Sequence, residues 1–325
     1  MMNKHTLTKI CAALLSGIML VGFVGCAANQ KEEIIDINEL VGTEFDMVPL
    51  GAAPVPVSVA MPVASGTKVL QNAKALIDVS HSDDGYLMVK YLEATQSKLK
   101  CIITCPSGTK YTYNLNNKGE YDVFPFSDGN GTYSIGVYKN VADSKYSVSY
   151  TGKVDVVLKD QFAPFRIPNQ YVNYKSDSAV VKKAAELCAS CTTDLERINA
   201  VYTFVINNFK YDDQLAATVT SGYLPDIDAV LASQKGICFD YAAVMTAMLR
   251  SQDIPCKLVI GYAGTVYHAW INAYSASEGW LNGVIFFDGQ NWKLMDPTFA
   301  STGGESKEVM DYIGNGSDYT AMYLY

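Results

Sequence analysis

The chain has 325 residues, of which 49% are hydrophobic and 18% charged, and it carries a formal net charge of −8. This apolar content is enough for at least one full hydrophobic core and excludes a wholly disordered chain. The basic residues are scattered along the sequence, so the clustered positive surface that nucleic-acid phosphates require is missing, and we expect no nucleic-acid partner.

The first 25 residues are typical of an export signal. Two lysines precede an apolar run over residues 10–24, which is shorter than the roughly 20 apolar residues of a membrane span. Small residues followed by Cys26 resemble a bacterial lipobox, in which the signal is cleaved and the cysteine is acylated, although Phe23 stands where leucine is usual. We expect residues 1–25 to be a lipoprotein signal peptide and Cys26 to be the lipidation site. The protein would then be extracytoplasmic and lipid-anchored to the cell membrane; an ordinary secretory signal and an uncleaved anchor are the alternatives.

The spacing of the eight cysteines does not suggest a disulfide framework. Cys101 and Cys105 lie four positions apart in an expected strand, about 13 Å at the usual strand rise, which is too far for a bridge. Cys188 and Cys191 lie near an expected helix end and could meet, so a bridge and two free thiols are both open there. Structural zinc needs about four ligands, and the exported part has two histidines besides its cysteines, so we expect no metal.

The next two segments differ in composition. Residues 26–66 resemble a tether, because the prolines between Pro49 and Pro62 favour an extended chain. In residues 67–162, short runs rich in tyrosine, valine and isoleucine alternate with turn sequences such as PSG, NNKG and SDGNG. This pattern predicts a small all-β, Ig-like sandwich of about seven antiparallel strands. Its role is open between a spacer or packing domain and a glycan- or protein-binding module with exposed tyrosines.

Residues 163–325 begin with helical patterns and continue with strand-like ones. Thr193 and Glu196 have the spacing of a capping box, and two further helices are expected over 227–233 and 238–251. Strand-like runs fill the part that follows, which predicts an α+β domain. The first helix carries an apolar stripe at helical spacing, formed by Ile198, Val201, Tyr202, Val205 and Phe209.

Three residues of this domain have the placement that a thiol enzyme's catalytic triad needs. Cys238 begins a helix, where unpaired backbone N–H groups and the helix dipole favour the reactive thiolate of a cysteine. His268 lies in the middle of a later strand, and Asp296 ends another strand just before Pro297. A carboxylate there can accept a hydrogen bond from a neighbouring histidine and fix its tautomer. Each residue alone is more often structural, but their order and context together predict a Cys-His-Asp triad.

Three segments carry a resemblance to a known family: GICFDYAAVMTAMLRSQDIPCKLVIGY, HAWINAY and WKLMDPTF. Together they resemble the core of the transglutaminase-like superfamily, which has a papain-like fold and includes transglutaminases, bacterial thiol peptidases and deglycosylating amidases. The resemblance covers roughly residues 170–300. It implies that Cys238 is the nucleophile, that His268 is the general base and acid, and that Asp296 orients the histidine. Two positions without a chemical role depart from the family's usual pattern and leave the subfamily open, namely Ile237 and Asp253.

Two further residues are candidates for the oxyanion site or the substrate cleft. The backbone N–H of Cys238 is the natural first oxyanion donor, and Tyr211 is a candidate second donor that could equally be a packing residue. Trp270 shares a side of its strand with His268, because side chains alternate along a strand. Trp270 could therefore shield the triad from water or line the cleft.

The resemblance implies a surface-anchored enzyme that acts on amide bonds of proteins or peptides, cell-wall-associated ones included. The cysteine would form a thioester, which water releases in a peptidase or amidase and an amine releases in a crosslinking enzyme. We expect no cofactor, because the sequence has no EF-hand-like loop or dense carboxylate cluster for calcium. Two alternatives belong to other classes: a non-catalytic binding module that keeps the fold, and a structural surface protein.

Overall fold

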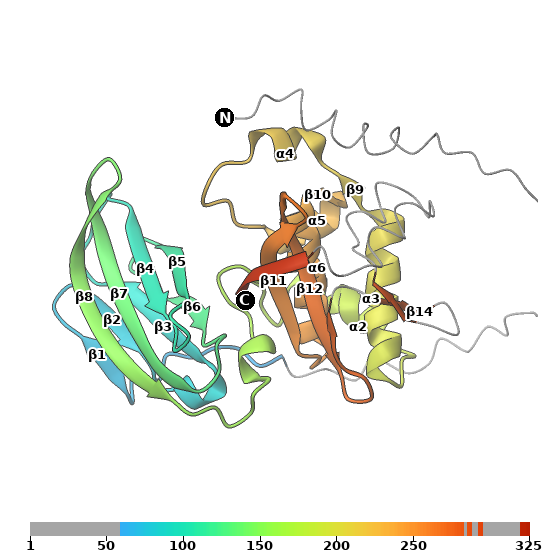
Figure 1. Ribbon diagram of the computed structural model, residues 1–325, viewed down its shortest axis with the longest axis horizontal. Helices are drawn as coiled ribbons and strands as arrows, with labels where there is room; N and C mark the ends of the chain where they lie inside the picture. Colours follow the sequence, from blue (N-terminus) through green and yellow to red (C-terminus); the bar gives the residue numbers. More distant parts are fainter. Residues whose placement is uncertain (1–58, 283–284, 288–291, 295–318) are drawn as a thin grey trace, which may run out of the picture. The chain divides into compact units, whose positions relative to one another are not determined.

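The computed structural model describes residues 59–282, 285–287, 292–294 and 319–325 (Figure 1). All of them belong to one structural unit, which spans Pro54–Tyr325. The expected signal peptide, the lipidation site Cys26, most of the tether and the candidate triad residue Asp296 lie outside the described residues. Within those ranges, no helix combines the length and apolarity needed to cross a bilayer.

The first half of the described chain is built from strands, as the turn-punctuated pattern predicted. Residues 69–156 form two four-stranded antiparallel sheets (Figure 1). The strands are β1 (Val69–Gln71), β2 (Ala75–Asp78), β3 (Tyr86–Tyr91), β4 (Leu99–Thr104), β5 (Lys110–Leu115), β6 (Asp122–Pro125), β7 (Gly131–Ala142) and β8 (Lys145–Val156). One sheet has the order β1-β2-β3-β6 and the other β5-β4-β7-β8. The structure has eight strands in this half where about seven were expected. Strand β1 is only three residues long, which is too short to show alternation in the sequence.

Alternation of buried and exposed residues explains why these segments form strands. In β5, Tyr111, Tyr113 and Leu115 are buried, and the residues between them are exposed. Tyr91 and Tyr133 are buried as well. These tyrosines therefore pack in the interior, so the structure favours core filling over an exposed stacking surface for them.

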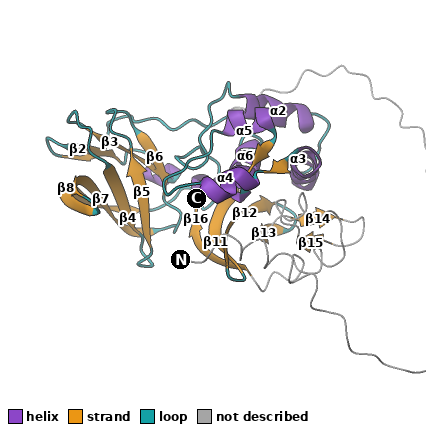
Figure 2. Ribbon diagram, turned by 90° about the horizontal axis from the view of Figure 1, so that it is seen from above, coloured by secondary structure: helices purple, strands orange, loops and turns teal. Residues whose placement is uncertain are grey.

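The second half contains helices followed by antiparallel strands, in the predicted order. Figure 2 shows the helices gathered on one side of a sheet with the order β13-β12-β11-β16. The helices are α2 (Ala179–Leu187), α3 (Asp194–Asn208), α4 (Asp213–Thr218), α5 (Ile227–Ser233) and α6 (Cys238–Arg250). The sheet strands are β11 (Cys256–Ala263), β12 (Val266–Ser275), β13 (Gly279–Asn282) and β16 (Tyr319–Leu324). Two small pairs complete the described strands: β9 (Lys210–Tyr211) with β10 (Lys235–Gly236), and β14 (Ile285–Phe287) with β15 (Trp292–Leu294).

Helix α6 is the central helix of this half, because every residue from Asp240 to Arg250 is buried. The buried Arg250 guanidinium donates hydrogen bonds to the carbonyl oxygens of Ile167, Cys256 and Tyr325 at 2.6–2.9 Å. These bonds tie the C-terminal end of the helix to three separate segments. Its N-terminal residue, Cys238, stays partly exposed.

The predicted capping box at the start of α3 is present. The Thr193 hydroxyl accepts a hydrogen bond from the Glu196 amide at 3.2 Å, and the Glu196 carboxylate accepts one from the Thr193 amide at 3.1 Å. Four members of the predicted apolar stripe are buried within the helix, and Phe209 is buried just beyond it. The pattern did not predict α4, the β9–β10 pair or strand β16.

The two halves pack against each other through aromatic side chains. The Tyr111 hydroxyl on β5 accepts a hydrogen bond from the Leu324 amide on β16 at 3.1 Å. The Tyr113 and Tyr171 rings lie 5.6 Å apart, and the Tyr111 and Tyr325 rings 5.4 Å apart. One continuous apolar core includes residues of both halves.

Candidate functional site

The predicted nucleophile, Cys238, is the first residue of α6, as expected. The first N–H groups of a helix have no acceptor within the helix, so they point at whatever lies beyond its start. Just before the cysteine the chain turns from strand β10 into α6, with the extended Ile237 as the N-cap. Cys238 therefore occupies the positive end of a buried helix.

Asp240 fixes this turn. Its fully buried carboxylate accepts a hydrogen bond from the Ile237 amide at 2.8 Å and one from the Tyr223 hydroxyl at 2.6 Å. Burial raises the pKa of this carboxyl, although both hydrogen bonds oppose the shift. Glycine is required at position 236, because a Cβ there would lie 2.6 Å from the Cβ of Asp240.

The candidate oxyanion residue Tyr211 is brought beside the turn by the pairing of β9 with β10. Tyr211 lies opposite Gly236 in this parallel pair, and the Asp212 amide donates to the Gly236 carbonyl oxygen at 2.9 Å. Burial, with a smaller effect of the nearby Cys238 thiol, raises the pKa of the Tyr211 hydroxyl. Tyr211 therefore remains a hydrogen-bond donor at neutral pH, within electrostatic range of the cysteine.

The predicted base, His268, lies on β12 and is buried. Its ring lies 6.2 Å from the Trp270 ring and 6.3 Å from the Tyr319 ring, between centroids. Opposite His268 in the sheet is Gly261, where a Cβ would lie 2.9 Å from the Trp270 ring and 2.0 Å from the Thr320 carbonyl oxygen. His268 and Trp270 thus belong to one tightly packed aromatic group on the same side of the strand.

The start of β12 lies within electrostatic range of the start of α6. Tyr267, the residue before His268, has its pKa raised by burial and, to a smaller degree, by the Cys238 thiol. Ala269 and Ile271, on the opposite side of β12 from His268, belong to the same core as the residues of α6. The Cys238 thiol therefore lies within electrostatic range of both Tyr211 and Tyr267. Because Asp296 lies outside the described residues, the complete triad stays a prediction.

The other described cysteines are unsuited to nucleophilic chemistry. Cys101, Cys105, Cys188 and Cys256 are buried, and Cys191 is partly exposed. Burial raises the thiol pKa of all five, to about 12 for Cys105, Cys188 and Cys256. The structure has Cys188 and Cys191 as free thiols, which is one of the two states left open above.

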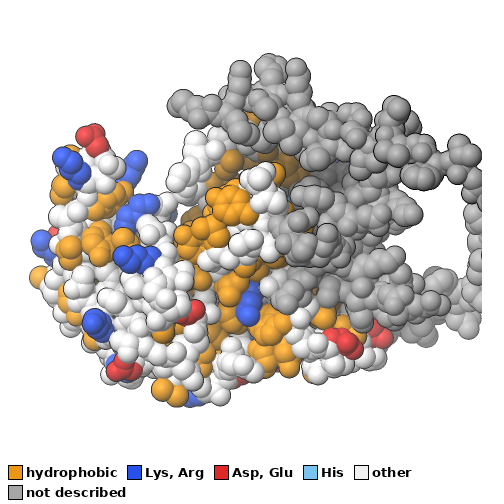
Figure 3. Space-filling view, viewed as in Figure 1, with side chains coloured by type: hydrophobic (Ala, Val, Ile, Leu, Met, Phe, Trp, Pro, Cys, Tyr) orange, Lys and Arg blue, Asp and Glu red, His pale blue; other side chains and the backbone are white. Residues whose placement is uncertain are grey.

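An exposed aromatic hairpin lies beside the cysteine. Tyr262 and Tyr267 face each other across the β11–β12 turn, with ring centroids 5.6 Å apart and 39% and 59% of their surfaces exposed. Val266 at the start of β12 and Met322 on β16 are exposed too. Figure 3 shows apolar side chains gathered over this region of β11 and β16. Contiguous exposed apolar surface of this kind often marks a binding site.

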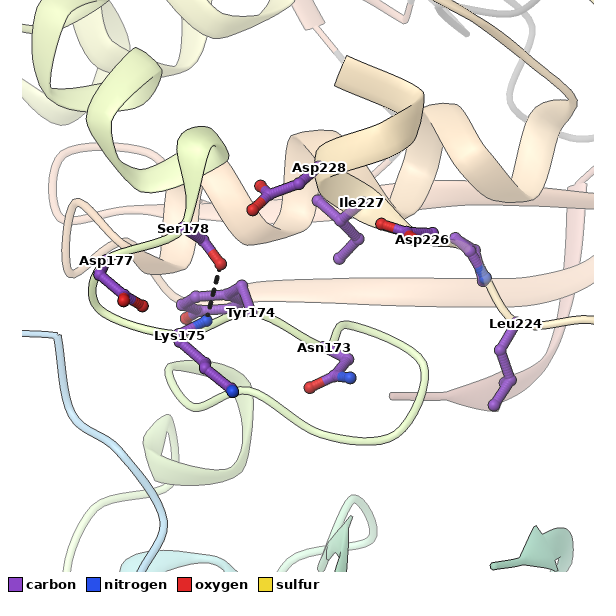
Figure 4. A pocket seen from close by; sticks show the side chains of 10 residues that line it. Asn173, Tyr174, Lys175, Asp177, Ser178, Leu224, Asp226, Ile227 and Asp228 are labelled. Atoms are coloured by element: carbon purple, nitrogen blue, oxygen red, sulfur yellow. Dashed lines mark hydrogen bonds between the residues drawn. The ribbon is translucent and has the colours of Figure 1, made fainter. Parts of the chain in front are cut away.

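A separate pocket of about 550 Å³ lies between the segment before α2 and the start of α5 (Figure 4). Two of its three carboxylates are used as helix caps: Asp228 accepts the amides of Ala179 and Val180, and Asp226 accepts that of Ala229. None of the predicted site residues lines it. Elsewhere too, the described residues contain no group of three or more His, Cys, Asp or Glu side chains placed to hold a metal ion. The pocket's lining is Asn173, Tyr174, Lys175, Asp177, Ser178, Leu224, Pro225, Asp226, Ile227 and Asp228.

Two neighbours of the nucleophile had not been predicted. Tyr267 directly precedes His268, so its place on the opposite side of the strand could have been inferred from alternation. Tyr223 lies in the loop between α4 and α5 and reaches Asp240 through tertiary structure alone. No local pattern in the sequence indicates that contact.

Residues 181–297 match the sequence model of a family described as the transglutaminase-like superfamily, and this span contains Cys238, His268 and Asp296. Kyphoscoliosis peptidase of Homo sapiens is 25% identical over 124 residues, which are 38% of this chain and 18% of that protein. The match thus spans less than a fifth of the curated relative's length.

Similar solved structures include a protein from Cytophaga hutchinsonii described as a candidate cysteine protease. It is 16% identical, with 74% of this chain and 76% of that chain covered and a TM-score of 0.38. Red sea bream transglutaminase is 11% identical, with 66% of this chain and 48% of that chain covered and a TM-score of 0.28.

Proposed function

Because residues 181–297 match the sequence model of the transglutaminase-like superfamily, we propose that this protein is a thiol enzyme that acts on amide bonds of proteins or peptides. The observation that carries the proposal is the placement of Cys238. It is a partly exposed cysteine at the start of a buried helix, whereas Cys101, Cys105, Cys188 and Cys256 are buried and the partly exposed Cys191 does not begin a helix. A helix start favours the thiolate, which is the nucleophilic form.

The chemistry follows from the roles of the proposed triad. His268 accepts the thiol proton as the Cys238 sulfur attacks the amide carbonyl carbon, and a tetrahedral oxyanion forms. The Cys238 N–H and the Tyr211 hydroxyl are the proposed donors to that oxyanion. When the C–N bond breaks, His268 returns the proton to the leaving amine, and a thioester remains on Cys238. Asp296 accepts a hydrogen bond from the imidazole and keeps it in the required tautomer.

Release of the thioester decides between two activities that use the same residues. Attack by water gives a carboxylic acid, as in a peptidase or amidase, and attack by a primary amine gives a crosslink. The exposed pair Tyr262 and Tyr267 is the proposed contact surface for the substrate beside the scissile amide. Trp270 is proposed to exclude water from the buried histidine.

The remaining organisation is proposed from the sequence. Cys26 carries the lipid anchor after removal of residues 1–25, and residues 26–66 tether the folded part outside the cytoplasm. Residues 67–162 form an Ig-like sandwich and residues 163–325 the catalytic domain. The two antiparallel sheets of β1–β8 support the first of these two assignments.

The test compares the wild type with Cys238→Ala and Cys191→Ala on a glutamine-containing peptide, with and without a primary amine. Ammonia release measures amide attack at glutamine by either route, and mass spectrometry detects cleaved or crosslinked products. We expect Cys238→Ala to abolish product formation and Cys191→Ala to retain it. Equal product formation by all three proteins would exclude Cys238 as the nucleophile. No product from the wild type across a panel of cell-surface proteins would favour the non-catalytic binding module.

A further inference from the structure

The proposed mechanism leaves one buried ionisable group beside the nucleophile without a part in the chemistry. Asp240 lies two residues after Cys238, fully buried, and both of its carboxylate oxygens accept hydrogen bonds. One bond comes from the Ile237 amide, which belongs to the turn that presents the cysteine. The other comes from Tyr223, which is distant in sequence and therefore needs an explanation of its own.

Tyr223 is held in place from two sides. Its ring packs edge-on against that of Phe239, with centroids 6.3 Å apart. Its hydroxyl donates to Asp240 Oδ1 at 2.6 Å, a short bond of the kind that a charged acceptor makes. Because burial raises the pKa of this hydroxyl, Tyr223 stays protonated and remains the donor.

The loop that carries Tyr223 is seated against β5 of the N-terminal half. Gly222 has φ = +91°, and a Cβ there would lie 2.5 Å from Asn114 Nδ2. Asn114 is exposed; its side-chain oxygen accepts from Lys100 Nζ and its carbonyl oxygen accepts from Gln170 Nε2, each at 2.5 Å. The positive φ favours glycine at position 222, and without a Cβ the loop approaches the Asn114 side chain closely.

We propose that Tyr223 is a positioning residue for Cys238, acting through Asp240, and that strand β5 holds its loop in place. The contacts run from Asn114 to Gly222, from Tyr223 to Asp240, and from Asp240 to the turn before the cysteine. The N-terminal β domain is then part of the active-site support and more than a spacer. The effect on turnover rests on the proposed function, whereas the effect on the thiol does not.

The first experiment measures Tyr223→Phe, Asp240→Asn and the double variant. Tyr223→Phe keeps the ring contact with Phe239 and removes the hydroxyl. The matched control is Tyr91→Phe, which removes a tyrosine hydroxyl that donates to the Glu93 carboxylate at 3.1 Å in the β domain. The readouts are the iodoacetamide rate constant of Cys238, kcat and KM on the peptide amide substrate, and the melting temperature.

We expect Tyr223→Phe to change the Cys238 alkylation rate at least about threefold and to lower kcat about tenfold, with KM within about twofold. Asp240→Asn should do the same, and the double variant should add little to either single change, because both act through one contact. Tyr91→Phe should leave the rate and kcat unchanged. A merely structural role would lower the melting temperature but leave kcat per titrated active site unchanged. That result, or additive effects in the double variant, overturns the proposal.

A second experiment tests the support from β5. Gly222→Ala is compared with Gly129→Ala, because Gly129 also has a positive φ of 76° but has no atom within 4 Å of the added Cβ. We expect Gly222→Ala to alter Cys238 alkylation as Tyr223→Phe does, and Gly129→Ala to leave it unchanged. Equal effects of the two glycine variants would overturn the part assigned to β5. If the wild type proves inactive on every amide substrate, the alkylation rates still decide the positioning role.

Discussion

At the scale of single residues, the six described cysteines differ mainly in burial. Cys238 is partly exposed at a helix start, whereas burial raises the thiol pKa of Cys101, Cys105, Cys188, Cys191 and Cys256. A thiol reacts with iodoacetamide as its thiolate, so a raised pKa slows the reaction at neutral pH.

We therefore expect iodoacetamide at pH 7 to label Cys238 at least about tenfold faster than any other described cysteine, and His268→Ala to slow that labelling. Peptide mass spectrometry over a time course measures both. Cys191 is the internal comparison, because it is the other partly exposed thiol among the described residues. Equal labelling of Cys191 and Cys238 would contradict the special role of the helix start.

A second prediction at the residue scale concerns Asp240 and the pH dependence of folding stability. Burial raises the pKa of this carboxyl above its ordinary value of 3.8, so the folded state binds its proton more tightly than the unfolded state. Such a group contributes stability below its unfolded pKa, and this contribution is lost as pH rises through the folded pKa. Asp240→Asn cannot titrate, so the variant should gain melting temperature relative to the wild type as pH rises above about 4. A difference that is constant with pH, or that shrinks, would contradict the sign.

At this scale, sequence reasoning proposed candidate residues that are marked by the pattern of their immediate neighbours. Cys238 was identified by the helix that it begins and His268 by the strand that surrounds it, and the structure has both in those elements. Tyr223 could not be found, because its contact with Asp240 depends on how a loop folds back across 17 positions. Asp296 remains a prediction of the sequence.

At the scale of elements, local patterns predicted what lies within one segment and missed what depends on pairing between distant segments. Helices α3, α5 and α6 were predicted nearly to their ends, because capping residues and apolar spacing lie within each segment. Strand β16 was not predicted, and its pairing with β11 spans more than fifty intervening positions, beyond the reach of a local pattern. The pairing of β9 with β10 is only two residues long on each side, which leaves no periodic pattern to detect.

The closeness of β11 and β16 gives an element-scale prediction. At Gly261 an added Cβ would lie 2.0 Å from the Thr320 carbonyl oxygen, which is backbone and cannot rotate away. Gly261→Ala should therefore separate the strands and cost about 1–3 kcal/mol of folding free energy. Hydrogen exchange of a peptide covering Tyr319–Leu324 should lose protection. Gly279→Ala is the control, since its cost comes from a positive φ of 79° with no atom near the added Cβ. That variant should leave exchange at Tyr319–Leu324 unchanged.

At the scale of the whole molecule, the two halves share a core. Buried residues of β1–β8 and of the α+β half belong to one apolar cluster, which includes Tyr113 on one side and Tyr325 on the other. The sequence changes in composition near residue 162, which predicted two domains, and no pattern in it indicates that they share an interior. Contacts between halves depend on side chains that alternate within one strand and meet residues more than fifty positions away, such as Tyr113 with Tyr171.

A shared core predicts that the halves unfold together. Truncation of a large buried aromatic side chain costs about 3–5 kcal/mol, so Tyr113→Ala should lower the melting temperature by many degrees. The three tryptophans, Trp270, Trp280 and Trp292, all lie in the C-terminal half, so their fluorescence reports that half alone. Pulse alkylation of the buried Cys101 and Cys105 reports the β domain.

In the wild type, the fluorescence and alkylation midpoints should coincide, as they do for one cooperative transition. In Tyr113→Ala, both midpoints should fall by the same amount, although the substitution lies in the β domain and every tryptophan lies in the other half. Tyr133→Ala serves as the comparison, because Tyr133 is buried in the β domain against Phe126. A β-domain midpoint that falls while the tryptophan midpoint stays fixed would mean that the halves unfold independently. It would also weaken the support that β5 is proposed to give the loop of Tyr223, because a strand that melts separately cannot hold that loop in place.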